Sequence, residues 1–298
     1  MSRLLNSLQI CSESLKWSNL PMRIRLLYIT KNPAVGIVAE RAGVDWIFVD
    51  LEYRGKRNRQ ANRNTVISAH TLDDVRAMRQ VIKKSKLLVR VNRWGEWSAD
   101  EIEGVIKAGA DIVMLPFFTS IEEVSSFIRQ VGRRAQVCLL LETLAAIELL
   151  DDILALPGIE FVHIGLNDLH IQRGTTFMFE FLADGGVDKI AEKLRAADIS
   201  FGFGGMARIG NLIPPAERIL AEHFRLGSTG VILSRSFCNP AQATGSTAFE
   251  TMFRLEVAKV RSEEARLIQA DASFFERTRR QVIEEIALVV QRMNEAQA

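Results

Sequence analysis

The stretch AGVDWIF, residues 42–48, places a glycine after a helical segment and then enters an apolar run that favours a strand. Similar helix-to-strand joints recur at residues 108–114 (AGADIVM) and 226–232 (LGSTGVI). Glycine is common just past a helix C-terminus, because it readily adopts the left-handed conformation that ends many helices. The three joints therefore indicate a chain in which helices alternate with strands.

Around these joints lie eight short apolar runs, separated by longer amphipathic segments. Most runs are apolar throughout, as expected of parallel strands that are covered on both faces. Strand–helix alternation is typical of βαβ units, and eight units are what a (β/α)8 TIM barrel needs. The predicted strands are 24–29, 46–50, 87–91, 112–115, 137–141, 161–164, 199–204 and 231–233, and the clearest predicted helices are 99–108, 121–131, 145–154 and 215–226.

An open, doubly wound sheet is the alternative fold. It predicts a glycine-rich turn after the first strand, but residues 30–33 read TKNP, and the glycine cluster FGFGG lies late, at 201–205. We therefore predict the barrel, divided into an N-terminal extension (1–22), a barrel catalytic domain (23–247) and a C-terminal helical extension (248–298). The C-terminal extension has apolar residues at helical spacing. Helices of this kind usually cover a barrel end or pack against another subunit.

Composition argues against several classes of function. The net charge of +2, from 38 basic and 36 acidic residues, gives no general reason to expect nucleic acid or an anionic membrane as partner. No apolar run approaches the roughly 20 residues of a membrane span, and the N-terminus is a poor signal peptide. The three cysteines are scattered and form no CxxC pair, which suits a reducing compartment. These features predict a cytoplasmic protein.

In a barrel of this type, the residues that follow the strands form the active site. Glu142 and Asp168 directly follow two adjacent predicted strands, so their carboxylates would converge at one end of the barrel. Carboxylate oxygens are the ligands of hard divalent ions such as Mg²⁺ or Mn²⁺. Glu142 could equally favour a helix dipole and Asp168 could cap the next turn, and spacing alone does not choose between these interpretations.

Five motifs resemble those of the HpcH/HpaI aldolase and citrate lyase family, in the family's order, over about residues 24–237. LLLETLAAI around Glu142 and VHIGLNDLHI around Asp168 look like its two metal-binding motifs. The others are AGVDWIFVDLEYRG from residue 42, LLVRVN from residue 87 and AGADIVMLPFFTSIEEV from residue 108.

The resemblance implies roles for individual residues. Glu142 and Asp168 correspond to the metal ligands, and Arg90 to the arginine that binds a 2-oxo acid and stabilises its enolate. Asp50 and Glu52 stand in the acidic motif of the second strand. The segment Gly165, Leu166 and Asn167 precedes the second metal ligand and is expected to contact substrate. The family also implies pyruvate as the enolate partner and a homo-oligomer.

The sequence departs from the family at Tyr53, where the aldolases commonly carry the acid–base histidine. A tyrosine, with an ordinary pKa near 10, is a poor general base at neutral pH. His70, in the long segment after the second strand, is the best candidate to replace it, and His170 is a second. His163 lies within a predicted strand and His223 within a predicted helix, where a structural role is expected.

Basic residues follow several predicted strands. The segment 53–64 contains Arg54, Lys56, Arg57, Arg59 and Arg63, and Arg208, Ser234 and Arg235 follow strands seven and eight, where barrels often bind phosphate. A solvated loop is one interpretation, and a binding site for an anionic substrate is the other. No aromatic interleaving indicates RNA binding.

The sequence therefore favours a metal-dependent carbon–carbon lyase that acts on a 2-oxo acid through a metal-stabilised enolate. An acyl-CoA-linked or phosphoenolpyruvate-type lyase is an alternative on the same barrel. A catalytically altered barrel that serves in binding or assembly is another, because of Tyr53. We expect a small anionic molecule as substrate, and neither nucleic acid nor membrane as partner.

Overall fold

Eight parallel strands form a closed barrel in the computed structural model, which describes residues 23–54, 70–210, 212–234, 237 and 247–296. Each strand pairs with its sequence neighbours, and β8 pairs with β1 to close the ring. This closure confirms the predicted barrel over the open sheet. The strands are β1 (Arg25–Ile29), β2 (Trp46–Asp50), β3 (Lys86–Arg90), β4 (Ile112–Leu115), β5 (Gln136–Leu141), β6 (Phe161–Ile164), β7 (Ser200–Met206) and β8 (Gly230–Leu233).

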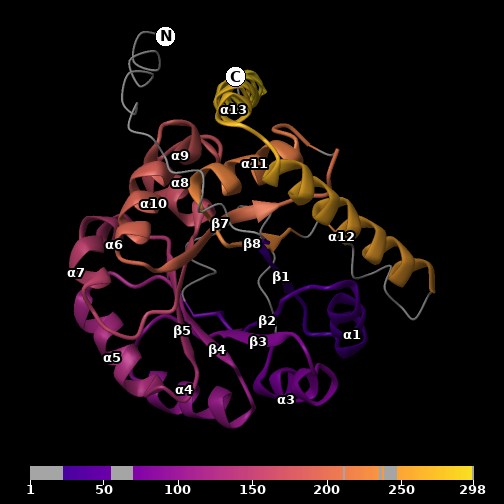
Figure 1. Cartoon of the computed structure of the whole chain (residues 1–298). Helices are drawn as coiled ribbons and strands as arrows, with labels where there is room; N and C mark the ends of the chain where they lie inside the picture. Colours follow the sequence, from indigo (N-terminus) through magenta and orange to yellow (C-terminus); the bar gives the residue numbers. More distant parts are fainter. Residues whose placement is uncertain (1–22, 55–69, 211, 235–236, 238–246, 297–298) are drawn as a thin grey trace.

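Helices surround the barrel, as the ring of ribbons in Figure 1 shows. The single helix predicted over 145–154 is wrong, because one helix ends at Glu148 and another begins at Leu150. The helices are α1 (Pro33–Ala42), α3 (Leu72–Val81), α4 (Ser98–Lys107), α5 (Ile121–Val131), α6 (Leu144–Glu148), α7 (Leu150–Leu154), α8 (Leu166–Arg173), α9 (Glu180–Ala183), α10 (Gly186–Ala196), α11 (Ala216–Leu226), α12 (Thr247–Ile268) and α13 (Ala272–Glu295). None of these described helices is both long and apolar enough to cross a bilayer.

Side chains inside the barrel form a small apolar cluster of their own: Leu27, Trp46, Phe48, Leu88, Ile112, Met114, Cys138, Leu140 and Phe161. Successive side chains of a strand point to opposite faces, so the residue two positions further along faces inward again. The next inward-facing residues along β2, β3 and β5 are Asp50, Arg90 and Glu142. They lie at the carboxyl ends of these strands. We call this end the mouth of the barrel. The polar residues of the site thus form the layer directly above the interior core.

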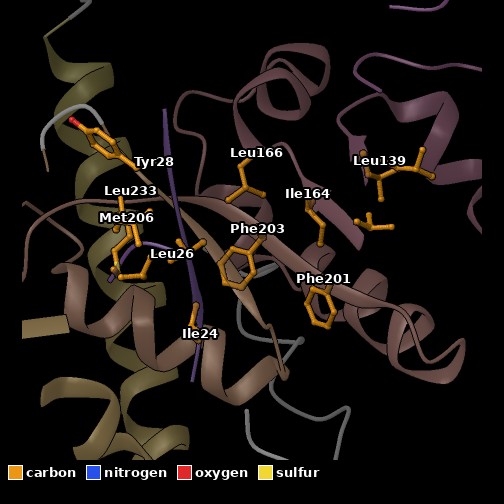
Figure 2. Close-up of a cluster of buried hydrophobic side chains, with 14 of the residues drawn as sticks. Ile24, Leu26, Tyr28, Leu139, Ile164, Leu166, Phe201, Phe203, Met206 and Leu233 are labelled. Atoms are coloured by element: carbon orange, nitrogen blue, oxygen red, sulfur yellow. The ribbon is translucent and has the colours of Figure 1, made fainter. Parts of the chain in front are cut away.

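Alternate side chains of the same strands face the helices and form the larger core. Figure 2 shows part of this layer, in which Leu26 of β1, Phe203 of β7 and Leu233 of β8 lie among other buried apolar side chains. Burial of a Leu- or Phe-sized side chain stabilises a protein by roughly 1.5–3 kcal/mol. The two apolar layers hold the strands rigidly, which fixes the positions of the polar side chains at the mouth.

The C-terminal helices are part of this fold, as predicted, and each has defined contacts. Helix α12 lies along α1 (Figure 1) and also contacts α11. Its buried Glu264 accepts a hydrogen bond from the backbone N–H of Ile24 at 2.9 Å, and its Arg261 binds Asp45 at 3.0 Å. Helix α13 contacts α11 and α9, with Arg279 on Glu222 at 3.2 Å. Helix α12 thus occupies the place of the helix that follows β8, whereas the domain boundary at residue 248 stays a prediction.

Candidate active site

A buried ion pair lies where β2 and β3 reach the mouth. Asp50 and Arg90 are register partners in the sheet, so their side chains emerge next to each other. Arg90 donates from Nε and Nη2 to the two carboxylate oxygens of Asp50, at 2.8 and 2.7 Å. Its Nη2 also lies 3.5 Å from Oε2 of Glu52. This two-point pairing holds the guanidinium plane in one orientation.

The neighbouring carboxylates keep Arg90 protonated. Burial alone would lower the pKa of Arg90, but the carboxylates of Asp50, Glu52 and Glu142 outweigh it and raise the pKa above its ordinary value. The arginine is therefore a permanent cation. Within the described part of the chain, no hydrogen bond engages Nη1, which leaves that nitrogen able to donate to a ligand.

The two predicted metal ligands come from neighbouring strand ends and are both buried, with 3% of Glu142 and 9% of Asp168 exposed. Oε1 of Glu142 accepts a hydrogen bond from the backbone N–H of Phe117 at 3.1 Å. The Gln172 side chain donates to the Glu142 carbonyl oxygen at 2.9 Å. Because Gln172 and Asp168 both lie on α8, this bond ties the two carboxylate-bearing segments together.

The donor set at the mouth fits a hard divalent cation. Glu142 and Asp168 are both buried, and carboxylate oxygens are the ligands that such an ion prefers. Among the described residues, no group of three or more potential metal ligands is present. Two carboxylates suffice for such an ion where water and substrate fill its other positions.

Gly165 provides the space that the Glu142 side chain occupies. A Cβ at residue 165 would lie 2.7 Å from Cβ of Glu142 and 3.0 Å from its Oε2. The glycine has φ −85°, which any residue adopts, so close approach rather than backbone conformation requires it.

We expect Gly165→Ala to weaken binding of Mg²⁺ or Mn²⁺ by about 10- to 100-fold, because the added methyl displaces the Glu142 carboxylate. Isothermal titration would measure the affinity. Gly205→Ala is the matched control, since a Cβ there would meet only ordinary contacts, the nearest at 3.5 Å. Equal affinity in Gly165→Ala and wild type would contradict this positioning of Glu142.

His70 lies beside the Asp50–Arg90 pair, just before α3. The backbone N–H of Asp50 donates to its Nδ1 at 2.9 Å. In the neutral imidazole the proton then stands on Nε2, and the lone pair of Nδ1 is already engaged. In this geometry His70 can accept a proton on Nδ1 only by losing the bond from Asp50. His170, the second candidate from the sequence, is buried on α8.

Tyr53 stands at the rim of the mouth, with 54% of its surface exposed. Its backbone N–H and that of Arg54 both donate to Oδ1 of Asn92, at 3.0 and 2.9 Å. Asn92 is held in turn by Glu101, which accepts from its backbone N–H and from its Nδ2 at 2.6 Å. Asn92 was not among the residues predicted for the site, although its position two residues after Arg90 places it on the same inward row.

His163 lies inside the barrel, one layer below the mouth. The register between β7 and β8 shifts between Gly202 and Gly205, and Gly204 has a left-handed φ of +54°. The imidazole donates from Nε2 to the Gly204 carbonyl oxygen at 3.0 Å and so satisfies a backbone group at this irregularity. This buried histidine thus has the structural role predicted for it, as does His223, which stacks on Phe203 and bonds Ser228.

The free energy of unfolding is expected to fall as the pH falls from about 6.5 to 4. Burial lowers the pKa of His163 to about 4, and the charge of Arg90 adds to this effect. The unfolded chain, with an ordinary histidine pKa, binds the proton first, so acid favours unfolding. The contribution is about 3 kcal/mol at pH 4. Urea unfolding across this range should show a shallower pH dependence for His163→Gln, whereas an unchanged slope would contradict this account.

The remaining predicted contacts lie around the mouth or outside the described residues. The Leu166 side chain is buried in the outer core (Figure 2), so only its backbone can face a ligand, and Asn167 is half-buried. Nε of Arg208 donates to the Phe237 carbonyl oxygen at 2.5 Å, and the backbone N–H of Ser234 donates to the Met206 carbonyl oxygen at 2.8 Å. The predicted N-terminal extension, Lys56, Arg57, Arg59, Arg63 and Arg235 lie outside the described residues.

Solved structures with the same fold share little sequence with this chain. An HpcH/HpaI aldolase from Desulfitobacterium hafniense DCB-2 is 17% identical, with a TM-score of 0.58 over 72% of this chain and 86% of that one. An HpcH/HpaI aldolase/citrate lyase family protein from Burkholderia cenocepacia J2315 is 13% identical, with a TM-score of 0.58 over 84% and 98%. The citrate synthase SbnG is 15% identical, with a TM-score of 0.58 over 84% and 96%. At such identities the likeness shows the fold alone.

Sequence comparison goes further than these structures. No curated protein matches the chain. The family profile described as HpcH/HpaI aldolase/citrate lyase, however, matches residues 23–203, which is more than half of the chain and includes β1 to β6 and both acidic strand ends. The protein therefore belongs to the HpcH/HpaI aldolase/citrate lyase family.

Proposed function

We propose that the protein is a divalent-metal-dependent carbon–carbon lyase that acts on a 2-oxo acid through an enolate, with pyruvate as the enolate partner. The observation that carries the proposal is the arrangement of Arg90. Asp50 and Glu52 hold its guanidinium, its Nη1 is left for a ligand, and its charge interacts with Glu142. An oriented cation beside a pair of metal-binding carboxylates suits a substrate on which an oxyanion develops.

The enolate-forming part of the reaction has groups suited to it. Mg²⁺ or Mn²⁺, held by Glu142 and Asp168, would supply Lewis acidity toward the keto and carboxylate oxygens of the substrate. In the cleavage of a 4-hydroxy-2-oxo acid, the C3–C4 electron pair passes toward C2 and the keto oxygen gains charge. Arg90 donates from Nη1 to that oxygen. The 4-hydroxyl group loses its proton to water as the aldehyde forms, and C3 takes a proton from water as pyruvate forms.

The tautomer of His70 restricts its part in these proton transfers. With Nδ1 accepting from Asp50, the imidazole carries its proton on Nε2. We therefore propose His70 as a group that holds the backbone of Asp50 in position, and not as the base that removes a proton in the same geometry. Tyr53, with its largely exposed ring, is assigned to the rim and not to proton transfer.

Two reactions test the proposal, and together they separate enolate stabilisation from proton transfer. Decarboxylation of oxaloacetate forms the pyruvate enolate without removal of a carbon-bound proton, so it reports on enolate stabilisation alone. Exchange of the pyruvate methyl protons in deuterated water, followed by proton NMR, also requires acid–base chemistry. We expect both to depend on Mg²⁺ or Mn²⁺ and to exceed the rate with free metal ion.

The alternatives give different results in the same experiment. A barrel that only binds would gain thermal stability from metal and pyruvate but would accelerate neither reaction, which would overturn the proposal. An acyl-CoA-linked or phosphoenolpyruvate-type lyase would require those compounds for turnover. Size-exclusion chromatography with light scattering would test the homo-oligomer that the resemblance predicts.

A further inference from the structure

Arg54 stands at the rim of the mouth, two residues beyond Glu52, in a position fixed through its backbone. Its N–H and that of Tyr53 donate to the Asn92 side chain, which Glu101 of α4 holds from the other side. The two rim residues are therefore anchored to the loop that follows β3. Arg54 itself is exposed to solvent.

The Arg54 guanidinium rests on an aromatic surface. Its central carbon lies 4.3 Å from the centre of the Trp97 ring and 5.2 Å from that of Tyr53. The indole is itself held in place, because Nε1 of Trp97 donates to the Arg93 carbonyl oxygen at 3.1 Å. A Cβ at Gly95 would lie 2.5 Å from the indole, so the glycine leaves the room that the ring occupies. Stacking of this kind orients a guanidinium while its N–H groups stay available.

No carboxylate of the described residues forms an ion pair with Arg54. The nearest interacting one is Glu101, whose two oxygens accept from the backbone and side chain of Asn92. Burial raises the pKa of the Glu101 carboxyl, and the charge of Arg54 acts only in the opposite sense. Among the described residues, no group accepts a hydrogen bond from the Arg54 guanidinium. Its donors therefore face the solvent at the mouth.

We propose that Arg54 binds an anionic group, a carboxylate or a phosphate, on the electrophilic substrate that meets the enolate. The inference rests on the proposed lyase reaction and defines the class of its second substrate. Arg90 lies deep, with its charge directed at the 2-oxo acid, whereas Arg54 lies at the rim, where the far end of an aldehyde would extend. A planar guanidinium binds either anion through two parallel hydrogen bonds.

Matched pairs of aldehydes test this assignment in the pyruvate addition reaction. Glyceraldehyde 3-phosphate is compared with glyceraldehyde, and 4-oxobutanoate with butanal, so that the two arms separate phosphate from carboxylate. Wild type should favour the anionic member of one pair. Arg54→Met should lower kcat/KM for that member by about 10- to 100-fold, mainly through KM, while the neutral member changes little. Trp97→Leu should give a smaller loss in the same direction, because it removes the supporting ring.

Arg76→Ala is the matched control, since it removes one positive charge from an exposed ion pair with Asp73 on α3. It should leave the anionic preference of wild type intact. Equal loss for charged and neutral aldehydes in Arg54→Met, or no loss for either, would overturn the inference.

Binding alone separates this inference from the proposed function. Isothermal titration with glycerol 3-phosphate and with succinate, and with glycerol as the neutral match, needs no reaction. We expect one of the two anions to bind the wild-type protein and to bind Arg54→Met about 10-fold more weakly or worse. Anion binding that depends on Arg54, in a protein without enolate chemistry, would reject only the lyase. Anion binding that is absent or equal in both proteins would reject only the role of Arg54.

Discussion

Replacing Glu142 by Gln and Asp168 by Asn is expected to abolish the stabilisation that Mg²⁺ or Mn²⁺ gives to the wild-type protein. A ligand at 100 times its dissociation constant stabilises the folded state by about 2.7 kcal/mol. The double variant lacks both carboxylates that would hold the ion, so its melting temperature should not respond. Its metal-dependent decarboxylation of oxaloacetate should fall by about 1,000-fold or more, because the Lewis acid supplies several kcal/mol.

The metal-free double variant should fold well, which makes this test easy to interpret. Each replacement keeps the size of the side chain and removes only its charge. The amide oxygen that Glu142→Gln introduces can still accept the bond from Phe117. As a control, Glu148→Gln with Asp151→Asn removes the same charge from exposed positions on α6 and α7. A metal response that survives in the Glu142/Asp168 variant would show that the ion binds elsewhere.

Replacing Arg90 by Met is expected to reduce both stability and activity. The side chain is 14% exposed and pairs with Asp50, which is 3% exposed. Removing one partner of a buried ion pair leaves an uncompensated charge and costs about 3–5 kcal/mol. Loss of the donor to the developing oxyanion should lower kcat by about 100- to 1,000-fold. Urea unfolding and the oxaloacetate assay measure the two effects separately.

Two further variants distinguish the structural from the chemical contribution of Arg90. Arg90→Lys keeps the charge but cannot bind both oxygens of Asp50 in one plane, so it should recover stability more than rate. Adding Asp50→Asn to Arg90→Met removes the uncompensated charge and should restore part of the stability without restoring activity. Full activity of the Arg90→Met variant, measured under conditions in which it is folded, would remove Arg90 from the proposed mechanism.

The mouth of the barrel could be located from the sequence because strand position and side-chain direction follow from local pattern. All eight strands were predicted within about two residues, since an apolar run bounded by turn signals is a property of neighbouring residues. Once the strands are placed, alternation brings Asp50, Arg90 and Glu142 to the same layer of a closed barrel. The family profile over 23–203 confirms the family to which the motifs pointed.

Contacts between distant segments were not predictable in this way. The bond from Asp50 to His70 joins residues 20 positions apart, and it changes the chemistry expected of that histidine. The contact of Arg54 with Trp97 depends on how two loops approach each other. It also depends on Gly95, which leaves room for the indole and belongs to no recognisable sequence motif. The division of 145–154 into α6 and α7 could not be predicted either, because this segment contains no glycine or proline.

The barrel, the order of its strands and the set of polar residues at its mouth could thus be derived from the chain alone, because each follows from local periodicity. Which of these side chains pair with each other is seen only in the tertiary structure. Arg90 is held by Asp50 and Glu52 because β2 and β3 align in register, with Asp50 and Arg90 lying 40 residues apart in the chain. Helix α12 became the neighbour of α1 because closure of the ring brings the last unit beside the first. Such pairing depends on strand register and ring closure, which no single segment of the chain encodes.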